Sequence, residues 1–340
     1  MSVLSDSSLS DSSTSPSATE IDLRLPDTRA IDEAWHRIRP HIHETPVLRS
    51  TTFDRLAGAE LFFKCECFQR VGAFKIRGAV NTVFSLDEAE ASRGVVTHSS
   101  GNHGQAVALA ARLRGIPATI VMPENATAVK IAAVEGYGAE VIRCEPTLAA
   151  RESTAQACRE ERGLTLVHPY DEPRVVAGQA SVARELLEAV PDLDAIVVPV
   201  GGGGLLAGTA LQARRHHAPV RVIGAEPSGA DDAARSFRSG VHEPMDDPRT
   251  LADGLRTRLG GLAFSILSDH VDTIITVSDE AIIAAMRALW ERMKLVVEPS
   301  AAVPLAAILE SDVDLSASRI GVVLTGGNVD LDRLPWTRTH

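Results

Sequence analysis

The sequence predicts an α/β fold with parallel β-sheets joined by helical crossovers, and three observations lead to this fold class. Apolar runs of strand length alternate along the chain with alanine-rich helical patterns, an order that produces parallel strands with helical connections. Several runs are continuously apolar and rich in Val and Ile, as strands buried on both faces are. With 340 residues, the chain is long enough for a large core and for two domains or subdomains.

Eight segments have the length and composition of strands. They cover 61–68, 95–100, 118–123, 139–144, 195–200, 221–226, 272–277 and 319–327. Helical patterns lie between them, at 104–115, 130–138, 148–161, 178–190 and 280–294. Because ligands of parallel α/β sheets bind at the carboxyl ends of strands, the loops that follow these strands are the candidate functional sites.

The composition narrows the possible partners and locations. A net charge of −11 disfavours a nucleic-acid surface, which needs clustered Lys and Arg. Residues 1–28 are predicted to be a disordered tail, because the N-terminus is rich in Ser, Thr and Asp and lacks the pattern of a secretory signal. Residues 195–213 carry no charge, but four consecutive glycines and a proline indicate a strand, a loop and a helix start rather than a membrane span. We therefore expect a cytoplasmic protein.

The four cysteines are too few for a disulfide scaffold in a chain of this length. Cys65 and Cys67 resemble half of a zinc site. The sequence has no second pair of Cys or His at zinc spacing, so a zinc site is disfavoured.

The first two candidate loops contain a lysine and a run of small polar residues. Lys75 lies in GAFKIRGA (72–79) and is either an ordinary surface lysine or a nucleophile. The second loop follows a predicted strand with Ser99, Ser100, Gly101, Asn102, His103 and Gly104. Such residues at the start of a helix suit an anion such as a carboxylate, although Ser and Asn also cap helices for structural reasons alone.

The third loop contains four glycines between a strand and a helix, an arrangement that can bind a phosphate. These residues are Gly201, Gly202, Gly203 and Gly204, called the glycine loop below. Tight packing of the helix against the strand is a purely structural explanation of these glycines. A dinucleotide site is another alternative. Gly202, Gly204 and Ala207 satisfy the dinucleotide pattern G-x-G-x-x-A, and Glu226 ends the next predicted strand about 20 residues later, which together suggest an NAD-dependent oxidoreductase.

The fourth loop, LTGGNVD (324–330), favours a different phosphate-bearing cofactor over a dinucleotide. An NAD site has no use for this loop, for Lys75 or for the Ser-Ser-Gly-Asn-His segment. Pyridoxal phosphate uses all four loops, because it needs a lysine for a Schiff base, a phosphate cup and a partner for its pyridine nitrogen.

The chain resembles the fold-type II pyridoxal-phosphate enzymes, in the branch of the serine/threonine dehydratases and serine racemases. The resemblance runs from about residue 30 to residue 335 and includes several motifs in the order found in the family. They are KCECFQRVGAFKIRGA (64–79), SSGNHGQ (99–105), GGGGL (201–205), AEPSGADD (225–232), ERMKLVVEP (291–299) and TGGN (325–328). One departure is Ala73, where many members have serine.

The resemblance implies two open, mostly parallel twisted sheets with helices on both faces and the cofactor in a cleft between a large and a small domain. We expect residues 29–89 and 167–335 to form the large domain and residues 90–166 the small one. The resemblance also implies a role for each matched residue: Lys75 for the Schiff base, Phe74 against the cofactor, Asn102 on the ring hydroxyl, the glycine loop on the phosphate and Thr325 on the pyridine nitrogen.

The resemblance further implies a divalent-cation site in AEPSGADD. Its ligands would be the carboxylates of Glu226 and Asp232 and the backbone carbonyl of Ala230. Oxygen ligands of this kind suit Mg²⁺ or Ca²⁺ rather than Zn²⁺. Glu226 is then a metal ligand rather than a ribose partner; the structural alternative is an acidic surface loop.

The activity implied is that of an ammonia-lyase that converts serine, threonine or 3-hydroxyaspartate into a 2-oxo acid and ammonia. Lys75 would act as the general base, and Ser99, Asn102 and His103 would contact the substrate. Arg151 matches an arginine that relatives direct at a substrate carboxylate, or else it is a solvated helix residue. We expect a homodimer that binds a small amino acid.

Two other activities remain open from the sequence. Ser100 matches the residue that protonates the opposite face in serine racemases, so racemisation of serine is the main alternative. A non-catalytic amino-acid sensor on the same fold is disfavoured because Lys75 and Ser100 are both present.

Overall fold

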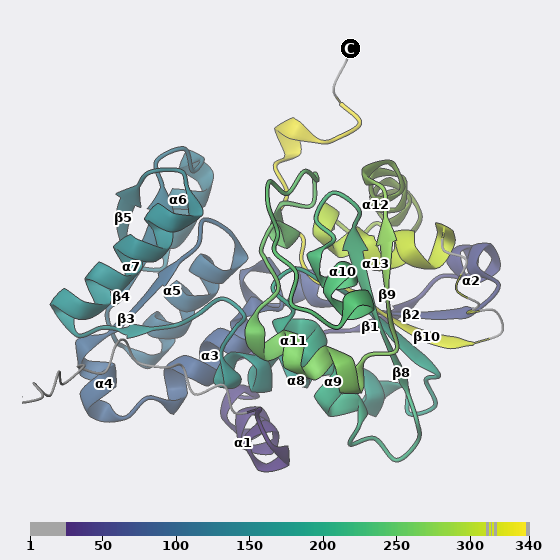
Figure 1. Cartoon of the computed structure of the whole chain (residues 1–340), viewed down its shortest axis with the longest axis horizontal. Coiled ribbons are helices and arrows are strands. Elements are labelled where there is room, and N and C mark those ends of the chain that lie inside the picture. The colour runs from purple at the N-terminus through teal and green to yellow at the C-terminus, as the bar shows by residue number, and fades with distance from the viewer. Residues whose placement is uncertain (1–24, 311–312, 314, 316–317, 338–340) are drawn as a thin grey trace, which may run out of the picture.

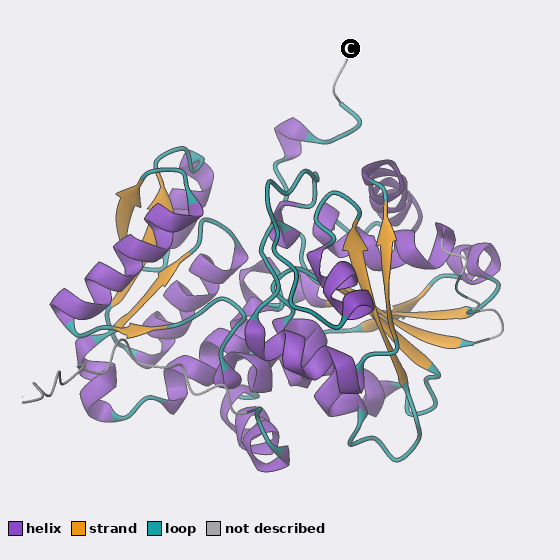
Figure 2. Cartoon of the chain, in the orientation of Figure 1, coloured by secondary structure: helices purple, strands orange, loops and turns teal. Residues whose placement is uncertain are grey.

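The computed structural model describes residues 25–310, 313, 315 and 318–337. It has two mostly parallel sheets, each covered by helices (Figures 1 and 2), and the predicted fold class is confirmed. The tail predicted for residues 1–28 lies largely outside the described residues, and Thr28 already belongs to helix α1.

The large sheet has the strand order β1-β2-β10-β7-β8-β9. Its strands are β1 (Val47–Arg49), β2 (Glu60–Cys65), β7 (Ala195–Pro199), β8 (Arg221–Pro227), β9 (Thr273–Val277) and β10 (Arg319–Leu324). Only the β1–β2 pair is antiparallel among these strands. The short edge strand β1 was not predicted, because three residues carry too little pattern to detect.

The small sheet has the order β5-β4-β3-β6, and its described pairs are all parallel. Its strands are β3 (Val95–His98), β4 (Ala118–Pro123), β5 (Glu140–Cys144) and β6 (Thr165–Leu166). The two-residue strand β6 was also missed. The strands of the two sheets come from the segments assigned to the large and small domains, whose limits at 89/90 and 166/167 remain a prediction.

The five predicted helices are present as α5 (Asn102–Arg114), α6 (Ala128–Gly136), α7 (Leu148–Arg162), α8 (Pro173–Ala189) and α12 (Asp279–Met293). Helix α8 begins earlier than the predicted residue 178, since Pro173 suits the first turn of a helix. The other α-helices are α1 (Thr28–Ile38), α2 (Thr51–Ala57), α3 (Lys75–Ser85), α4 (Glu88–Arg93), α9 (Gly204–Ala213), α10 (Asp232–Ser239), α11 (Gly261–His270) and α13 (Pro299–Glu310).

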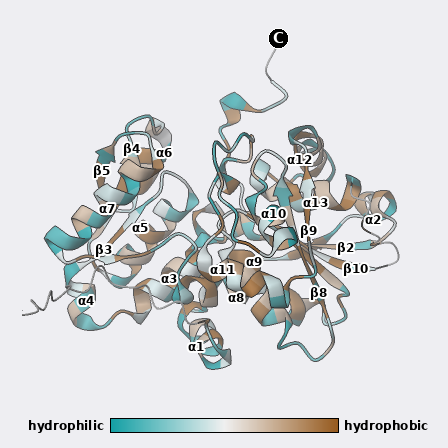
Figure 3. Cartoon of the chain, in the orientation of Figure 1, coloured by the Kyte–Doolittle hydropathy of each residue, from teal (hydrophilic) through white to brown (hydrophobic). Residues whose placement is uncertain are grey.

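Hydrophobic cores lie on both faces of the large sheet. Along β2, Leu61 and Phe63 belong to one core cluster and Phe62 to the other, as the alternation of side chains along a strand requires. The covering helices carry both hydrophobic and hydrophilic residues along their length (Figure 3). Helices α3 and α8 lie between the two sheets (Figure 1). No helix of the described residues is long and apolar enough to cross a membrane.

Candidate active site

Lys75 is the first residue of α3, and a tight turn places it beside the TGGN loop. Val71 and Gly72 have positive φ angles of 56° and 67°, and a Cβ atom at Gly72 would lie 2.8 Å from Oδ1 of Asn328. The backbone N–H of Phe74 donates to the carbonyl of Thr325 at 3.1 Å. Two of the four predicted loops are therefore in direct contact.

The Lys75 amine is set up as a nucleophile. Its Nζ donates to the carbonyl of Pro169 at 2.8 Å and lies 5.2 Å from the ring centroid of Phe74. Desolvation lowers the pKa of Lys75 to about 8, although the Glu298 carboxylate acts in the opposite direction. A lysine with this pKa is partly neutral near physiological pH, so it can form a covalent bond or accept a proton.

The Ser-Ser-Gly-Asn-His segment lies between β3 and α5, and its side chains do not cap the helix. Gly101 is the N-cap, without a side-chain cap from a described residue, and Ser99 Oγ accepts from Gly101 N–H at 3.2 Å. Ser100 is half-buried. The purely structural capping role is thus not observed, and the N–H groups of the first helical turn are left available for a ligand.

Asn102 is oriented by residues from the other side of the site. Its Nδ2 donates to both oxygens of Glu298, at 2.9 and 3.2 Å, and its Oδ1 accepts from Nδ2 of Asn328 at 2.9 Å. His103, in contrast, is buried, with its Nε2 3.0 Å from the carbonyl of Val167. Nδ1 of His103 has no hydrogen-bond partner among the described residues.

The glycine loop has the shape of a cradle that side chains would fill. Gly203 has a φ of +83°, and a Cβ there would lie 2.5 Å from Cβ of Ala263. A Cβ at Gly202 would lie 2.2 Å from the ring of Tyr170. Gly203 is also the N-cap of α9, without a side-chain cap. Free N–H groups in a glycine cradle at a helix N-terminus fit a phosphate group.

Residues 168–171 connect these loops, and sequence reasoning did not identify them. Pro169 accepts the Lys75 hydrogen bond, and Tyr170 packs on the glycine loop. Nδ1 of His168 accepts from the N–H of Asp171 at 2.8 Å, so the proton of the neutral ring is on Nε2. Desolvation lowers the pKa of His168 to about 3. The sequence feature that could have identified these residues is their position just after the predicted boundary between the two domains.

Glu298 is a further residue that sequence reasoning missed, although the quoted motif ERMKLVVEP contains it. It is 5% exposed, and desolvation raises its pKa to about 8. Its backbone N–H donates to the carbonyl of Gly326 at 3.0 Å. Glu298 therefore contacts both Asn102 and the TGGN loop, and its charge influences the pKa of Lys75.

Arg151 lies in the first turn of α7, where its Nε is 3.4 Å from the carbonyl of Thr147. Desolvation, and then the charge of Arg151, lower the pKa of His98 to about 4. A neighbouring cavity of about 330 Å³ is lined by His98, Glu152, Ser153, Ala155, Gln156, Leu166 and His168. Arg258 reaches this region and lies 3.8 Å from Glu152. Arg151 and Arg258 thus lie beside a cavity that is lined by the neutral imidazoles of His98 and His168.

A buried ion cluster fixes the first turn of α3. Arg77 binds Glu66 through Nε at 2.7 Å and Nη2 at 2.8 Å, and Glu185 through Nη1 at 2.7 Å and Nη2 at 2.8 Å. Lys64 donates to Glu185 at 2.6 Å. Each of these four side chains is at most 3% exposed. The cluster connects β2, α3 and α8, and Arg77 lies two residues after Lys75 in α3.

The predicted cation ligands lie at the end of β8, in the turn that follows and at the start of α10. The Glu226 carboxylate accepts from the N–H groups of Ala233 and Ala234, at 3.3 and 2.9 Å, and Oδ2 of Asp232 accepts from Leu259 N–H at 2.7 Å. Oδ1 of Asp232 is buried without a hydrogen-bond partner among the described residues. Desolvation raises the pKa of Glu226 to about 9.

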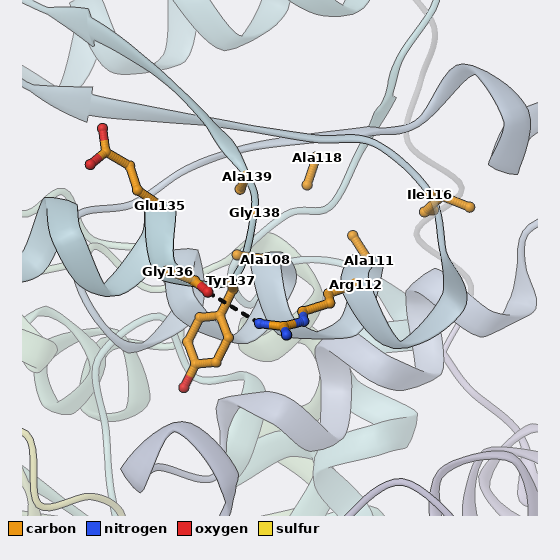
Figure 4. Close-up of a pocket in the computed structure, with 10 residues that line it drawn as sticks. All are labelled: Ala108, Ala111, Arg112, Ile116, Ala118, Glu135, Gly136, Tyr137, Gly138 and Ala139. Carbon is orange, nitrogen blue, oxygen red and sulfur yellow. Dashed lines mark hydrogen bonds between the residues drawn. The ribbon is translucent and has the colours of Figure 1, made fainter.

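Another cavity, of about 360 Å³, lies away from these loops, between α5, α6 and the start of β4 and β5 (Figure 4). Arg112 closes one side by donating to the carbonyl of Gly136 at 3.1 Å. The cavity shares no lining residue with the four candidate loops, so it does not belong to the predicted site.

Comparisons with known proteins agree with this geometry. The family model described as "Pyridoxal-phosphate dependent enzyme" matches residues 38–326. A serine racemase from Oryza sativa subsp. indica is 51% identical over 90% of this chain and 91% of its own. A beta-hydroxyaspartate dehydratase from Paracoccus denitrificans is 50% identical over 89% of this chain and 96% of its own.

Among solved structures, maize serine racemase superposes with a TM-score of 0.89 at 48% identity, covering 91% of this chain and 95% of its own. The cofactor predicted from the four loops is confirmed, and the dinucleotide alternative loses its support. The lysine, the glycine cradle and the TGGN loop are the parts of the chain that fit this cofactor. The chain belongs to the family of pyridoxal-phosphate-dependent enzymes.

Proposed function

We propose that the protein is an ammonia-lyase that converts a β-hydroxy amino acid, namely serine, threonine or 3-hydroxyaspartate, into a 2-oxo acid and ammonia. One observation carries the proposal: the amine of Lys75, with a pKa lowered to about 8, lies within one network with the TGGN loop and the glycine loop. Bound pyridoxal phosphate supplies an electron sink for the carbon next to the amino group.

The chain's own residues would bind and orient this cofactor. The N–H groups of the glycine loop and of α9 would bind the phosphate. Thr325 would face the pyridine nitrogen, Phe74 would pack against the ring, and Asn102 would bind the ring hydroxyl. The hydrogen bonds from Asn102 to Glu298 support this role, because they fix the side-chain amide before a ligand arrives.

Lys75 would then remove the proton from the substrate Cα. A general base works best when its pKa is near the working pH, and desolvation brings the pKa of Lys75 into that range. The adjacent carbonyl of Pro169 can hold the amine in place before and after the proton transfer. Departure of the β-hydroxyl completes the elimination.

Substrate contacts would come from the loop after β3 and from α7. Ser99 lies in the loop before α5, and Asn102 and His103 begin the helix. The burial of His103 favours a role in positioning the loop. Arg151 would bind a second carboxylate, as in 3-hydroxyaspartate, and Arg258 near Glu152 adds positive charge on the same side. The name of the Paracoccus relative supports a dicarboxylic substrate.

Racemisation of serine is the second candidate activity. It requires a proton donor on the face opposite Lys75, and Ser100 would be that donor. Its hydroxyl makes no hydrogen bond to another described residue, so it is free to act on a ligand. The names of the rice and maize relatives support this activity.

The proposal also includes a structural Mg²⁺ or Ca²⁺ ion bound by Glu226, Asp232 and the carbonyl of Ala230. Two buried carboxylates with raised pKa values, one with an unpaired oxygen, support an oxygen-ligand cation site. We also propose that the chain forms two separate domains, is located in the cytoplasm and assembles as a homodimer. Light scattering after gel filtration tests the assembly.

The decisive experiment measures 2-oxo acid and D-enantiomer together for L-serine, L-threonine and 3-hydroxyaspartate. We expect 2-oxo acid from at least one substrate and its loss in Lys75→Ala, while Lys294→Ala, on the exposed end of α12, keeps full turnover. Turnover that survives Lys75→Ala would contradict the proposal and favour a binding protein.

A further inference from the structure

Two cysteines lie at the end of β2, next to the candidate site but outside its proposed chemistry. Cys65 is the last residue of β2 and is fully buried, whereas Cys67, in the short 3-10 helix Glu66–Phe68, is partly exposed. Sγ of Cys65 lies 3.3 Å from the carbonyl of Phe63. Both side chains belong to the same hydrophobic cluster, Cys65 as a buried member and Cys67 as a partly buried residue packed against it.

The local backbone suits a covalent link between these thiols. In an extended strand, residues two apart have Cα atoms separated by about 6.6 Å, close to the upper limit of about 6.8 Å for a disulfide. The chain leaves the extended conformation at Cys65, with φ −92° and ψ 72°, and turns into the 3-10 helix. Because Glu66, the residue between the two cysteines, is in a 3-10 helix, which rises only about 2.0 Å per residue, the two Cα atoms lie closer together than in a strand.

The two thiols have different reactivity. The neighbouring Cys65 side chain, followed by the N–H groups of Cys67 and Phe68, lowers the pKa of Cys67 against the effect of desolvation. The same contact and burial raise the pKa of Cys65. A partly exposed thiol of lowered pKa beside a buried thiol of raised pKa is the arrangement in which an oxidised sulfur is resolved by its neighbour.

The pair is mechanically connected to Lys75. Glu66, between the two cysteines, accepts both hydrogen bonds from Arg77 described above and one from Thr45 Oγ1 at 2.6 Å. Cys67 also packs against the TGGN loop, since its Cβ lies 3.3 Å from the position of a Cβ at Gly327. Drawing Cys67 towards Cys65 must therefore rotate Glu66 and loosen both contacts.

We propose that Cys65 and Cys67 form a peroxide-sensitive dithiol switch that inactivates the enzyme reversibly. The Cys67 thiolate attacks one oxygen of hydrogen peroxide, the O–O bond breaks, and hydroxide leaves as the sulfur becomes a sulfenic acid. The Cys65 thiol gives its proton to hydroxide, forming water, and its sulfur attacks the sulfenic sulfur. The S–S bond forms, the S–O bond breaks, and the departing hydroxide takes a proton from solvent. Counted from two neutral thiols, the pair is oxidised by two electrons and peroxide is reduced to two waters.

The other two cysteines provide a matched control. Cys144 and Cys158 are buried in a core cluster of the small sheet. Desolvation raises the pKa of each thiol, so both should resist peroxide.

The test treats the cofactor-loaded enzyme with hydrogen peroxide, blocks free thiols with N-ethylmaleimide and maps the peptides by mass spectrometry. We expect the Cys65–Cys67 peptide to lose two hydrogens and to remain unlabelled, while turnover falls and returns with dithiothreitol. Cys67→Ser should abolish both effects, and Cys144→Ser should leave both intact.

Three outcomes would overturn the proposal: a Cys67 sulfinic acid with Cys65 still labelled, no oxidation of the pair, or a disulfide that leaves turnover unchanged. The peptide mass does not depend on the identity of the substrate. The disulfide can therefore be established or rejected even if the proposed lyase activity is wrong. If Cys67→Ser folds poorly, Cys67→Ala, read by the same peptide mass at Cys65, provides the second variant.

Discussion

The Asn102 amide donates to both carboxylate oxygens of Glu298, at 2.9 and 3.2 Å, and this contact joins the two halves of the candidate site. Asn102 begins α5, which packs beside the small sheet, whereas Glu298 precedes α13, which packs on the large sheet. Asn328 of the TGGN loop completes the connection by donating to Oδ1 of Asn102. The orientation of a proposed cofactor ligand thus depends on a buried acid far away in the sequence.

Replacing Glu298 by Gln should lower the pKa of Lys75 below about 8. The charge of Glu298 is the influence that raises this pKa against desolvation, so its removal leaves desolvation unopposed. The pH dependence of pyridoxal-phosphate capture by the cofactor-free protein measures the change. Glu280→Gln, on the exposed start of α12, is the control and should leave the profile unmoved.

The same substitution should change how stability depends on pH. In the folded protein the pKa of Glu298 is raised from 4.5 to about 8, so folding favours its protonated form. Its contribution to the free energy of unfolding is therefore fully present below pH 4.5 and is lost as the pH rises through about 8. Lys75 has the opposite effect on stability, and at higher pH. Because its pKa is lowered from 10.5 to about 8, burial of its charged form reduces stability below about pH 8, and this cost disappears by about pH 10.5. Urea unfolding of the cofactor-free protein across this range should show a flatter profile between about pH 4.5 and 8 for Glu298→Gln.

Replacing Arg77 by Met should destabilise the protein by about 3–5 kcal/mol, because it leaves the buried Glu66 and Glu185 without their main partner. Urea unfolding at neutral pH measures the loss. Arg287→Met breaks an exposed ion pair with Glu291 and should leave the unfolding midpoint unchanged. Equal stability of Arg77→Met and the wild type would mean that the cluster does not hold α3 in place.

The sequence predicted the fold class and the loops of the site because both depend on local patterns. Alternating apolar runs predict parallel strands, and clustered glycines mark the cradle at α9. It could not predict the contacts of Pro169 and Tyr170, because these depend on how the segment between the two sheets folds back over the glycine loop. Glu298 was missed for a related reason: its pKa is set by burial, which a charged residue in a short motif does not reveal.

Replacing Arg151 by Ala should raise the KM for 3-hydroxyaspartate by about 10- to 100-fold and leave that for serine nearly unchanged. A charge-assisted hydrogen bond contributes about 1.5–3 kcal/mol, and only the dicarboxylic substrate would make it. Arg159→Ala, near the other end of α7, is the matched control. An equal loss for both substrates would place Arg151 in the support of His98 rather than in substrate selection.

Adding Mg²⁺ or Ca²⁺ should raise the melting temperature, since a ligand that binds only the folded state at about 100 times its Kd adds about 2.7 kcal/mol. Asp232→Asn should abolish the increase, because it removes the buried carboxylate with the unpaired oxygen. Asp269→Asn, at an exposed position on α11, should retain it. If neither ion changes the melting temperature, these carboxylates have a purely structural role.

Replacing Ser100 by Ala should separate the two proposed activities. Elimination needs only the base Lys75, whereas racemisation also needs a proton donor on the opposite face, and the Ser100 hydroxyl is free of internal hydrogen bonds among the described residues. We expect formation of D-serine to fall by about 100-fold or more, while formation of pyruvate from L-serine changes by less than about threefold. Both products are measured in one reaction. Ser92→Ala, at an exposed position on α4, is the control and should leave both products unchanged. A parallel loss of both products would assign Ser100 to substrate binding, and no loss of either would contradict the two-face model.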